Sequence, residues 1–217
     1  MNNLVGHSIY RCNLGCFAVE GTIGSAYNFI MTGNGLAIQA ENNHIWARFI
    51  IAPAEVRGLP KINECSFKIK HGRIPQRFWD LALSVFLASP EVERYAGIRW
   101  DGQGYALYIP PQDGKAASLS YDCGQDIVFE MHSHPGMKPF FSGTDDKDEQ
   151  GMKVYGVLGY TLKDYSHLNG GLPVTQWEPL INLRIGVYGY FHPVKWSDIF
   201  EGVPGDVIDV SESGEAN

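Results

Sequence analysis

One stretch of the chain places an apolar run directly before two histidines, with an aspartate eleven residues after the second. Residues 126–131 are mostly apolar and β-favouring, which predicts a strand that ends at the histidines. Side chains two positions apart in a strand share a face, so His132 and His134 should project to the same side. Pro135 then ends the strand, and the following turn can bring Asp145 back to them. The chain must therefore fold so that a strand end and a turn converge on one point.

These three side chains are a typical ligand set for a catalytic metal ion. Two neutral imidazoles and a carboxylate suit zinc, and three protein ligands leave a fourth tetrahedral position for water. Zinc lowers the pKa of such a water from about 15.7 to about 7. The hydroxyl of Ser142 could meet a developing oxyanion, and losing one such donor costs about 2.7–4 kcal/mol. We therefore predict Zn²⁺ as the cofactor, held by His132, His134 and Asp145.

The spacing of these residues resembles the JAMM motif of JAB/MPN zinc metallo-isopeptidases. The resemblance rests on His-x-His-Pro at residues 132–135 and Ser-x-x-Asp at residues 142–145, and it covers roughly residues 74–200. It implies an α/β (α+β) fold, with a curved, mainly antiparallel sheet and flanking helices. It also implies Ser142 as oxyanion partner, an upstream glutamate as general acid/base, and activity on ubiquitin-like proteins.

Three glutamates are candidates for the general acid/base. Glu91 and Glu93 follow an expected helix and would share a face if they lay in a strand. We predict Glu93, because the family usually shows a glutamate followed closely by a small residue and an apolar run; Glu91 stays open as a substitute. Glu130 could orient an imidazole or act as the base itself. However, a position two residues before His132 lies about 6–7 Å away and reaches the water poorly.

The chain of 217 residues, 44% of them hydrophobic, can form one large domain or a medium domain with a small one attached. Asn34-Gly35 between apolar runs indicates an N-terminal hairpin, and the pattern after Pro75 predicts a helix that ends near Ser89. Whether the first unit recognises a partner or covers a sheet edge stays open. We expect a β-rich N-terminal unit at 1–73, a JAB/MPN-like metallopeptidase domain at 74–204, and a disordered acidic tail at 205–217.

A net charge of −7 and a pI near 5.4 argue against nucleic acid or an anionic membrane as the main partner. No segment approaches the roughly 18 apolar residues of a membrane helix, and the first residues show neither a charged leader nor an apolar run. Four irregularly spaced cysteines do not suggest a disulfide framework. We therefore expect a cytoplasmic protein.

The leading functional hypothesis is a zinc-dependent isopeptidase or peptidase that cuts at the C-terminal tail of a ubiquitin-like protein. The two-part layout also resembles bacterial family members encoded beside ThiF-like and ParB-like partners, which implies ThiF-like activating-enzyme partners. A second hypothesis is a non-catalytic MPN-type scaffold, although scaffold members usually lose metal ligands. A third is hydrolysis of small adducts on a sulfur-carrier-like protein.

Overall fold

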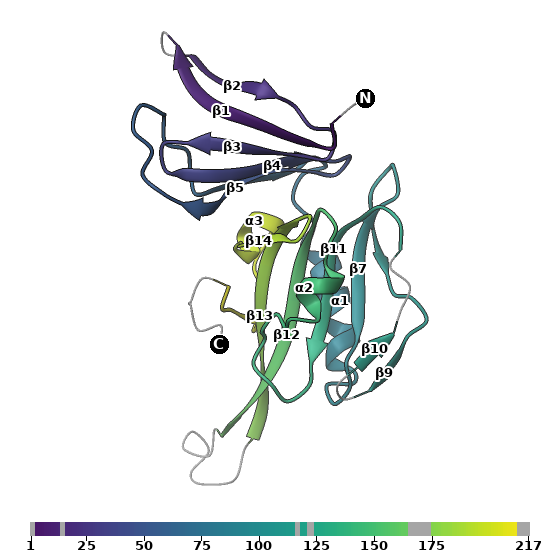
Figure 1. Cartoon of the computed structure of the whole chain (residues 1–217). Helices are drawn as coiled ribbons and strands as arrows, with labels where there is room; N and C mark the ends of the chain where they lie inside the picture. The colour runs from purple at the N-terminus through teal and green to yellow at the C-terminus, as the bar shows by residue number, and fades with distance from the viewer. Residues whose placement is uncertain (1–2, 14–15, 116–117, 121–123, 165–174, 212–217) are drawn as a thin grey trace. The chain divides into compact units, whose positions relative to one another are not determined.

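The computed structural model describes residues 3–13, 16–115, 118–120, 124–164 and 175–211 (Figure 1). The chain divides into two compact units. One comprises Met1–Gly72 together with Gln150–Met152 and Ile185–His192, and the other comprises Arg73–Glu149, Lys153–Arg184 and Pro193–Asn217. Two short segments from late in the chain therefore belong to the N-terminal unit.

The N-terminal unit is built on a six-stranded sheet in the order β2-β1-β3-β4-β5-β6. The predicted hairpin is confirmed, because Thr32 pairs with Gly35 across the turn. The Thr32 hydroxyl donates to the Gly35 carbonyl over 2.8 Å, which closes that turn. Phe29 lies edge-on to Tyr190, so the late segment adds aromatic packing to the sheet. The strands are β1 (Val5–Asn13), β2 (Cys16–Thr22), β3 (Tyr27–Thr32), β4 (Gly35–Glu41), β5 (Ile45–Pro53) and β6 (Cys65–Ile69).

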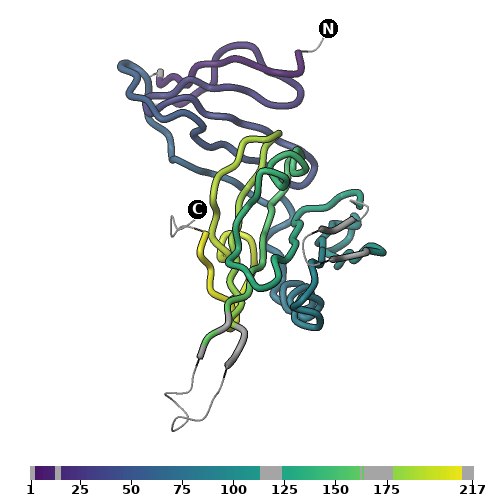
Figure 2. The backbone as a smooth tube through the Cα atoms, turned by 60° about the horizontal axis from the view of Figure 1, so that its bottom comes forward, coloured from purple at the N-terminus to yellow at the C-terminus, as the bar shows by residue number. Residues whose placement is uncertain are grey.

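The second large sheet has the order β14-β13-β12-β11-β7-β8, with β15 paired to β13. Strand β11 is an inner strand, antiparallel to β7 and parallel to β12. Figure 2 follows the backbone of these neighbouring strands. The strands are β7 (Tyr95–Trp100), β8 (Tyr105–Tyr108), β11 (Ile127–His134), β12 (Lys153–Asp164), β13 (Thr175–Val187), β14 (Tyr190–Pro193) and β15 (Ile208–Asp209); β9 (Asp113–Lys115) and β10 (Ser118–Ser120) form a separate pair.

The expected α/β (α+β) fold with flanking helices is wrong, because the described chain is mostly β. Its helices are α1 (Gln76–Leu87) and the single turns α2 (Asp145–Asp148) and α3 (Trp196–Ile199). Helix α2 does not continue beyond Asp148, because β12 begins at Lys153, only a few residues later. None of the helices in the described part of the chain is long and apolar enough to cross a membrane.

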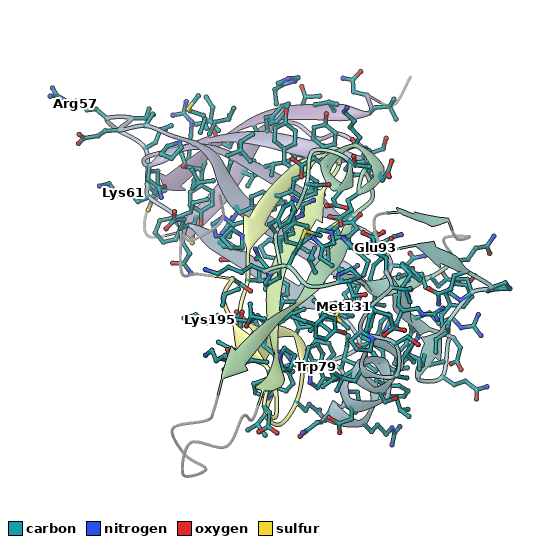
Figure 3. The ribbon with its side chains drawn as sticks, turned by 90° about the horizontal axis from the view of Figure 1, so that it is seen from below. Arg57, Lys61, Trp79, Glu93, Met131 and Lys195 are labelled. Carbon is teal, nitrogen blue, oxygen red and sulfur yellow. The ribbon has the colours of Figure 1, made fainter. Side chains whose placement is uncertain are left out.

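One face of β11 is filled by the core. Phe129 and Met131 are fully buried, and α1 contributes the fully buried Trp79. The ring of Phe200 links the two, since its centroid lies 5.1 Å from that of Phe129 and 5.2 Å from that of Trp79. Figure 1 shows α1 behind the sheet and α2 in front of it, and Figure 3 labels Met131 and Trp79 among the packed side chains. The alternate residues Glu130, His132 and His134 therefore lie on the opposite face of β11.

Part of the predicted disordered tail is ordered. Residues 208–209 form β15, in which Ile208 pairs with Leu180 of β13. The amide of Val210 also donates to the Ile181 carbonyl over 2.9 Å. An acidic composition thus did not prevent pairing at an available strand edge, and residues 212–217 lie outside the described part of the chain.

Candidate metal centre

Two histidines lie at the end of β11 on the face opposite the core. His132 pairs with Tyr95 of β7 and with Val157 of β12, so neighbouring strands fix its backbone on both sides. Because alternate side chains share a face, His134 projects with His132 and away from Met131. Their Nε2 atoms lie 3.2 Å apart. The two imidazoles are therefore directed at one point.

The third member of the cluster, Asp145, is oriented by a reciprocal pair of hydrogen bonds. The Ser142 amide donates to Asp145 Oδ2 over 2.5 Å, and the Asp145 amide donates to Ser142 Oγ over 3.3 Å. This reciprocal pattern is that of a capping box. It leaves Asp145 Oδ1 facing His132 Nε2 at 3.3 Å. The candidate ligand atoms of His132, His134 and Asp145 all lie within 4.8 Å of one another, which is close enough to share one ion.

Glu93 lies next to this cluster, just before β7 begins. The Arg94 amide donates to Ser133 Oγ and the Ser133 amide donates to the Arg94 carbonyl, both over 3.0 Å, so pairing with β11 continues past Tyr95. Burial raises the pKa of Glu93, while the charge of His132 opposes this shift. The carboxylate therefore lies within electrostatic reach of the cluster and apart from the core residues labelled in Figure 3.

The other two glutamates are placed differently. Glu91 is exposed, and residues 91–94 form no strand, so the expectation that Glu91 and Glu93 share a strand face is wrong. Glu130 is buried and accepts a hydrogen bond from Lys153 Nζ over 2.6 Å. The carboxylates that raise the pKa of His132 do not include it. Glu130 therefore joins β11 to β12 by an ion pair, whereas Glu93 is the one of the three candidates that acts on the charge of His132, as Glu149 at the end of α2 also does.

The protonation states of the histidines suit a metal site. Burial and the charge of His132 lower the pKa of His134 to about 4, which keeps this imidazole neutral and able to bind metal. Burial lowers the pKa of His132, but the hydrogen bond and charge of Asp145 outweigh it and raise the pKa above its ordinary value. A cation bound by His132 would compete with a proton for the same ring nitrogen. Two imidazole nitrogens and a carboxylate thus fit zinc, although His134 Nδ1 is buried without a hydrogen-bond partner among the described groups.

Four further side chains lie at the loop between β11 and β12, and sequence reasoning did not identify their arrangement. Three belong to the loop, and the fourth, Arg184, comes from β13. The buried Arg184 of β13 donates to Glu149 Oε2 from Nε over 3.0 Å and from Nη2 over 2.6 Å. Its guanidinium carbon lies 3.7 Å from the ring centroid of Phe141. The ring of Phe140, 37% exposed, lies edge-on to His134 with 4.8 Å between centroids. A charged residue within the apolar run 181–187 was the available signal.

Comparison with known families agrees with this geometry. Residues 88–169 match the family described as prokaryotic homologs of the JAB domain. The matched segment includes Glu93, both histidines of β11, Ser142 and Asp145. A search of curated proteins found no match to the chain. The match covers less than half of the chain, and over these residues the chain is similar to the prokaryotic JAB domain, which supports the resemblance to the bacterial branch of the JAMM/MPN family.

Proposed function

We propose that the chain is a zinc-dependent isopeptidase or peptidase that hydrolyses amide bonds at the C-terminal tail of a ubiquitin-like protein. The observation that carries the proposal is the convergence of His132, His134 and Asp145 beside Glu93. The JAB family is often hydrolytic and metal-dependent, which agrees with this cluster. Burial raises the pKa of Glu93, and carboxylates with raised pKa values are often found at functional sites, which supports a catalytic role for this residue.

In this proposal the two histidines and Asp145 hold the zinc ion. A bound zinc ion polarises the scissile carbonyl and lowers the pKa of water to about 7. Burial raises the pKa of Asp145, but hydrogen bonds from His132 and Ser142 lower it below the ordinary value, so the carboxylate stays ionised at neutral pH. His134 is neutral for the reasons given above. Asp145 and His134 are thus suited to bind a cation, and at His132 the cation would compete with a proton.

Glu93 would take a proton from the attacking water and return it to the leaving amine. A carboxyl with a raised pKa is better matched to both steps at neutral pH than an ordinary one. Ser142 Oγ accepts hydrogen bonds from the amides of Thr144 and Asp145, over 3.2 and 3.3 Å. These two bonds use the oxygen as acceptor. The hydroxyl proton also interacts with the Asp145 carboxylate, so in this proposal it turns from Asp145 to the developing oxyanion.

The substrate part of the proposal rests on the family resemblance and on the surface near the site. Phe140 and Met137 are 37% and 41% exposed in the loop after β11, where they can contact apolar residues near the scissile bond. We further propose a cytoplasmic location and ThiF-like activating enzymes as partners, since these enzymes attach or activate such tails. A sulfur-carrier-like protein is the alternative substrate, and a non-catalytic MPN-type scaffold is the alternative function.

The test is cleavage of a ubiquitin-like fusion protein by the zinc-loaded full chain. Glu93→Gln should lower the rate by about 100-fold or more, because general acid–base catalysis contributes about 10²–10⁴-fold. Glu91→Gln is the matched control from the same turn and should leave the rate unchanged, because Glu91 is exposed. A chelator should abolish cleavage.

Cleavage that continues after zinc removal, or in Glu93→Gln, would contradict the proposed chemistry. Tight binding of the fusion without cleavage would support the scaffold. Turnover of a small adduct on a sulfur-carrier protein, with no cleavage of tails, would replace the proposed substrate.

A further inference from the structure

We propose that Arg184 is a positioning residue for the metal centre. It would hold residues 141–149 so that Ser142 and Asp145 face the end of β11. Arg184 lies in β13, outside the segment that matches the JAB family. The inference rests on the proposed function, because it assigns Arg184 a role in the same site.

The contacts of Arg184 lie on both sides of the segment that carries the site residues. Its guanidinium stacks on Phe141, the residue directly before Ser142, with 3.7 Å between the guanidinium carbon and the ring centroid. Its Nη1 donates to Asp146 Oδ1 over 2.6 Å, and Asp146 directly follows Asp145. A single side chain thus fixes the chain immediately before Ser142 and immediately after Asp145.

A third contact fixes the end of α2. Arg184 donates from Nε and Nη2 to Glu149 Oε2, and the Glu149 amide donates to the Asp145 carbonyl over 2.8 Å. The two charged side chains are only 9% and 8% exposed. Burial raises the pKa of Glu149, and Arg184 opposes this shift. Arg184 therefore connects β13 to the last backbone hydrogen bond of α2.

Residues 141–149 need such a contact because their local structure is weak. Helix α2 is a single turn with no buried side chain. Isolated helices of this length are not stable in water, so the order of the segment has to come from tertiary contacts. Asp145, Asp146, Asp148 and Glu149 also place four carboxylates in one short stretch, and a nearby cation reduces their mutual repulsion.

The identity of the buried cation also favours a positioning role. A buried ion pair is often no more stabilising than apolar residues of similar volume, so stability alone does not explain Arg184. Arginine presents a planar fork that can stack on a ring and donate in several directions at once. Lysine keeps the charge but cannot reproduce this geometry. Arg184→Lys therefore separates positioning from charge.

The experiment measures zinc affinity of the full-length chain by competition with a chromophoric chelator. Replacing groups that orient metal ligands typically lowers affinity about 10–100-fold, and we expect a loss in this range for Arg184→Gln and a smaller loss for Arg184→Lys. The absorption spectrum of the Co²⁺-substituted protein should change in both variants. Hydrogen exchange should become faster at residues 141–149. Lys163→Gln is the control, because it removes an ion pair from β12 to Glu178 of β13, the strand that carries Arg184, without involving residues 141–149.

The outcomes distinguish the two proposals. If the unsubstituted chain does not bind zinc, the proposed function fails. If it binds zinc and both Arg184 variants keep its affinity and Co²⁺ spectrum, the positioning role is overturned while the proposed function stands. If Arg184→Gln does not fold, Glu149→Gln/Arg184→Met removes both buried charges, and it should fold with weakened zinc binding. Unchanged binding in that folded double variant would also overturn the inference.

Discussion

Gly159 provides the sharpest test of how the loop after β11 is held. This residue lies opposite His134 in the parallel register between β11 and β12. A Cβ at this position would lie 2.5 Å from the Met137 carbonyl oxygen and closer still to the Pro139 amide nitrogen. The Tyr160 amide also donates to the Met137 carbonyl over 2.9 Å. The missing side chain therefore lets the loop rest directly on β12.

The expected magnitude follows from what the new methyl group meets. Overpacking typically costs about 1–3 kcal/mol, and backbone atoms cannot rotate away, so Gly159→Ala should lower the free energy of unfolding by about 3 kcal/mol. At Gly156, on the same strand, a Cβ would meet the side-chain ends of Leu183 and Phe129 at 3.1 Å. Gly156→Ala should therefore cost only about 1 kcal/mol. At Gly143 nothing lies within 4 Å, so alanine there should stabilise by about 0.5 kcal/mol.

Urea unfolding of the three variants measures the change in the free energy of unfolding for each. Zinc titration of the same variants shows whether displacement of the loop after β11 affects the metal centre. Gly159→Ala should also weaken zinc binding, because the displaced residues directly follow His134. If Gly159→Ala unfolds at the same urea concentration as Gly143→Ala, the loop does not pack on β12 as described. If only Gly156→Ala is destabilised, the assigned cause is wrong.

Other predictions follow from the charges. Lys153→Met should lower the free energy of unfolding by about 2 kcal/mol, because it removes the ammonium group that pairs with the Glu130 carboxylate, whose side chain is only 9% exposed. Adding Glu130→Gln should restore most of the lost stability, as measured by urea unfolding. Below the raised pKa of His132, zinc affinity should fall about tenfold per pH unit, because zinc then displaces one proton from His132. His134 should add no further loss until the pH nears its pKa of about 4. Competition with a chelator from pH 8 to 5 measures the affinity. Saturating zinc at about 1,000 times Kd should add about 4 kcal/mol of stability, and a chelator should lower Tm accordingly.

The sequence allowed the cluster to be predicted because its geometry is mostly local. Alternation along one strand places His132 and His134 together, and the Ser-x-x-Asp spacing matches the reciprocal hydrogen bonds of Ser142 and Asp145. Their roles in catalysis stay predictions. Glu93 was chosen because the family usually shows a glutamate followed closely by a small residue and an apolar run. It lies just before β7, and its electrostatic coupling to His132 and Asp145 places it near the cluster.

Contacts between distant parts of the chain could not be read from the sequence. Alternation puts Glu130 on the face of His132, but its partner Lys153 lies 23 residues away and decides its role. Arg184 likewise meets Asp146 across 38 residues. The helix content was overestimated because the family resemblance suggested flanking helices, whereas in the connection between β11 and β12, residues 135–152, only the single turn α2 is helical.

The parallel pairing of β11 and β12 has a consequence for how this domain can change. Two strands that run the same way cannot be joined by a tight hairpin, and such connections usually need about a dozen residues or more. Here residues 135–152 make that return path, and they carry both Ser142 and Asp145. Deletions in this path would therefore disturb the pairing of β11 with β12, whereas insertions on its exposed side would change the surface beside the metal centre and leave the sheet intact.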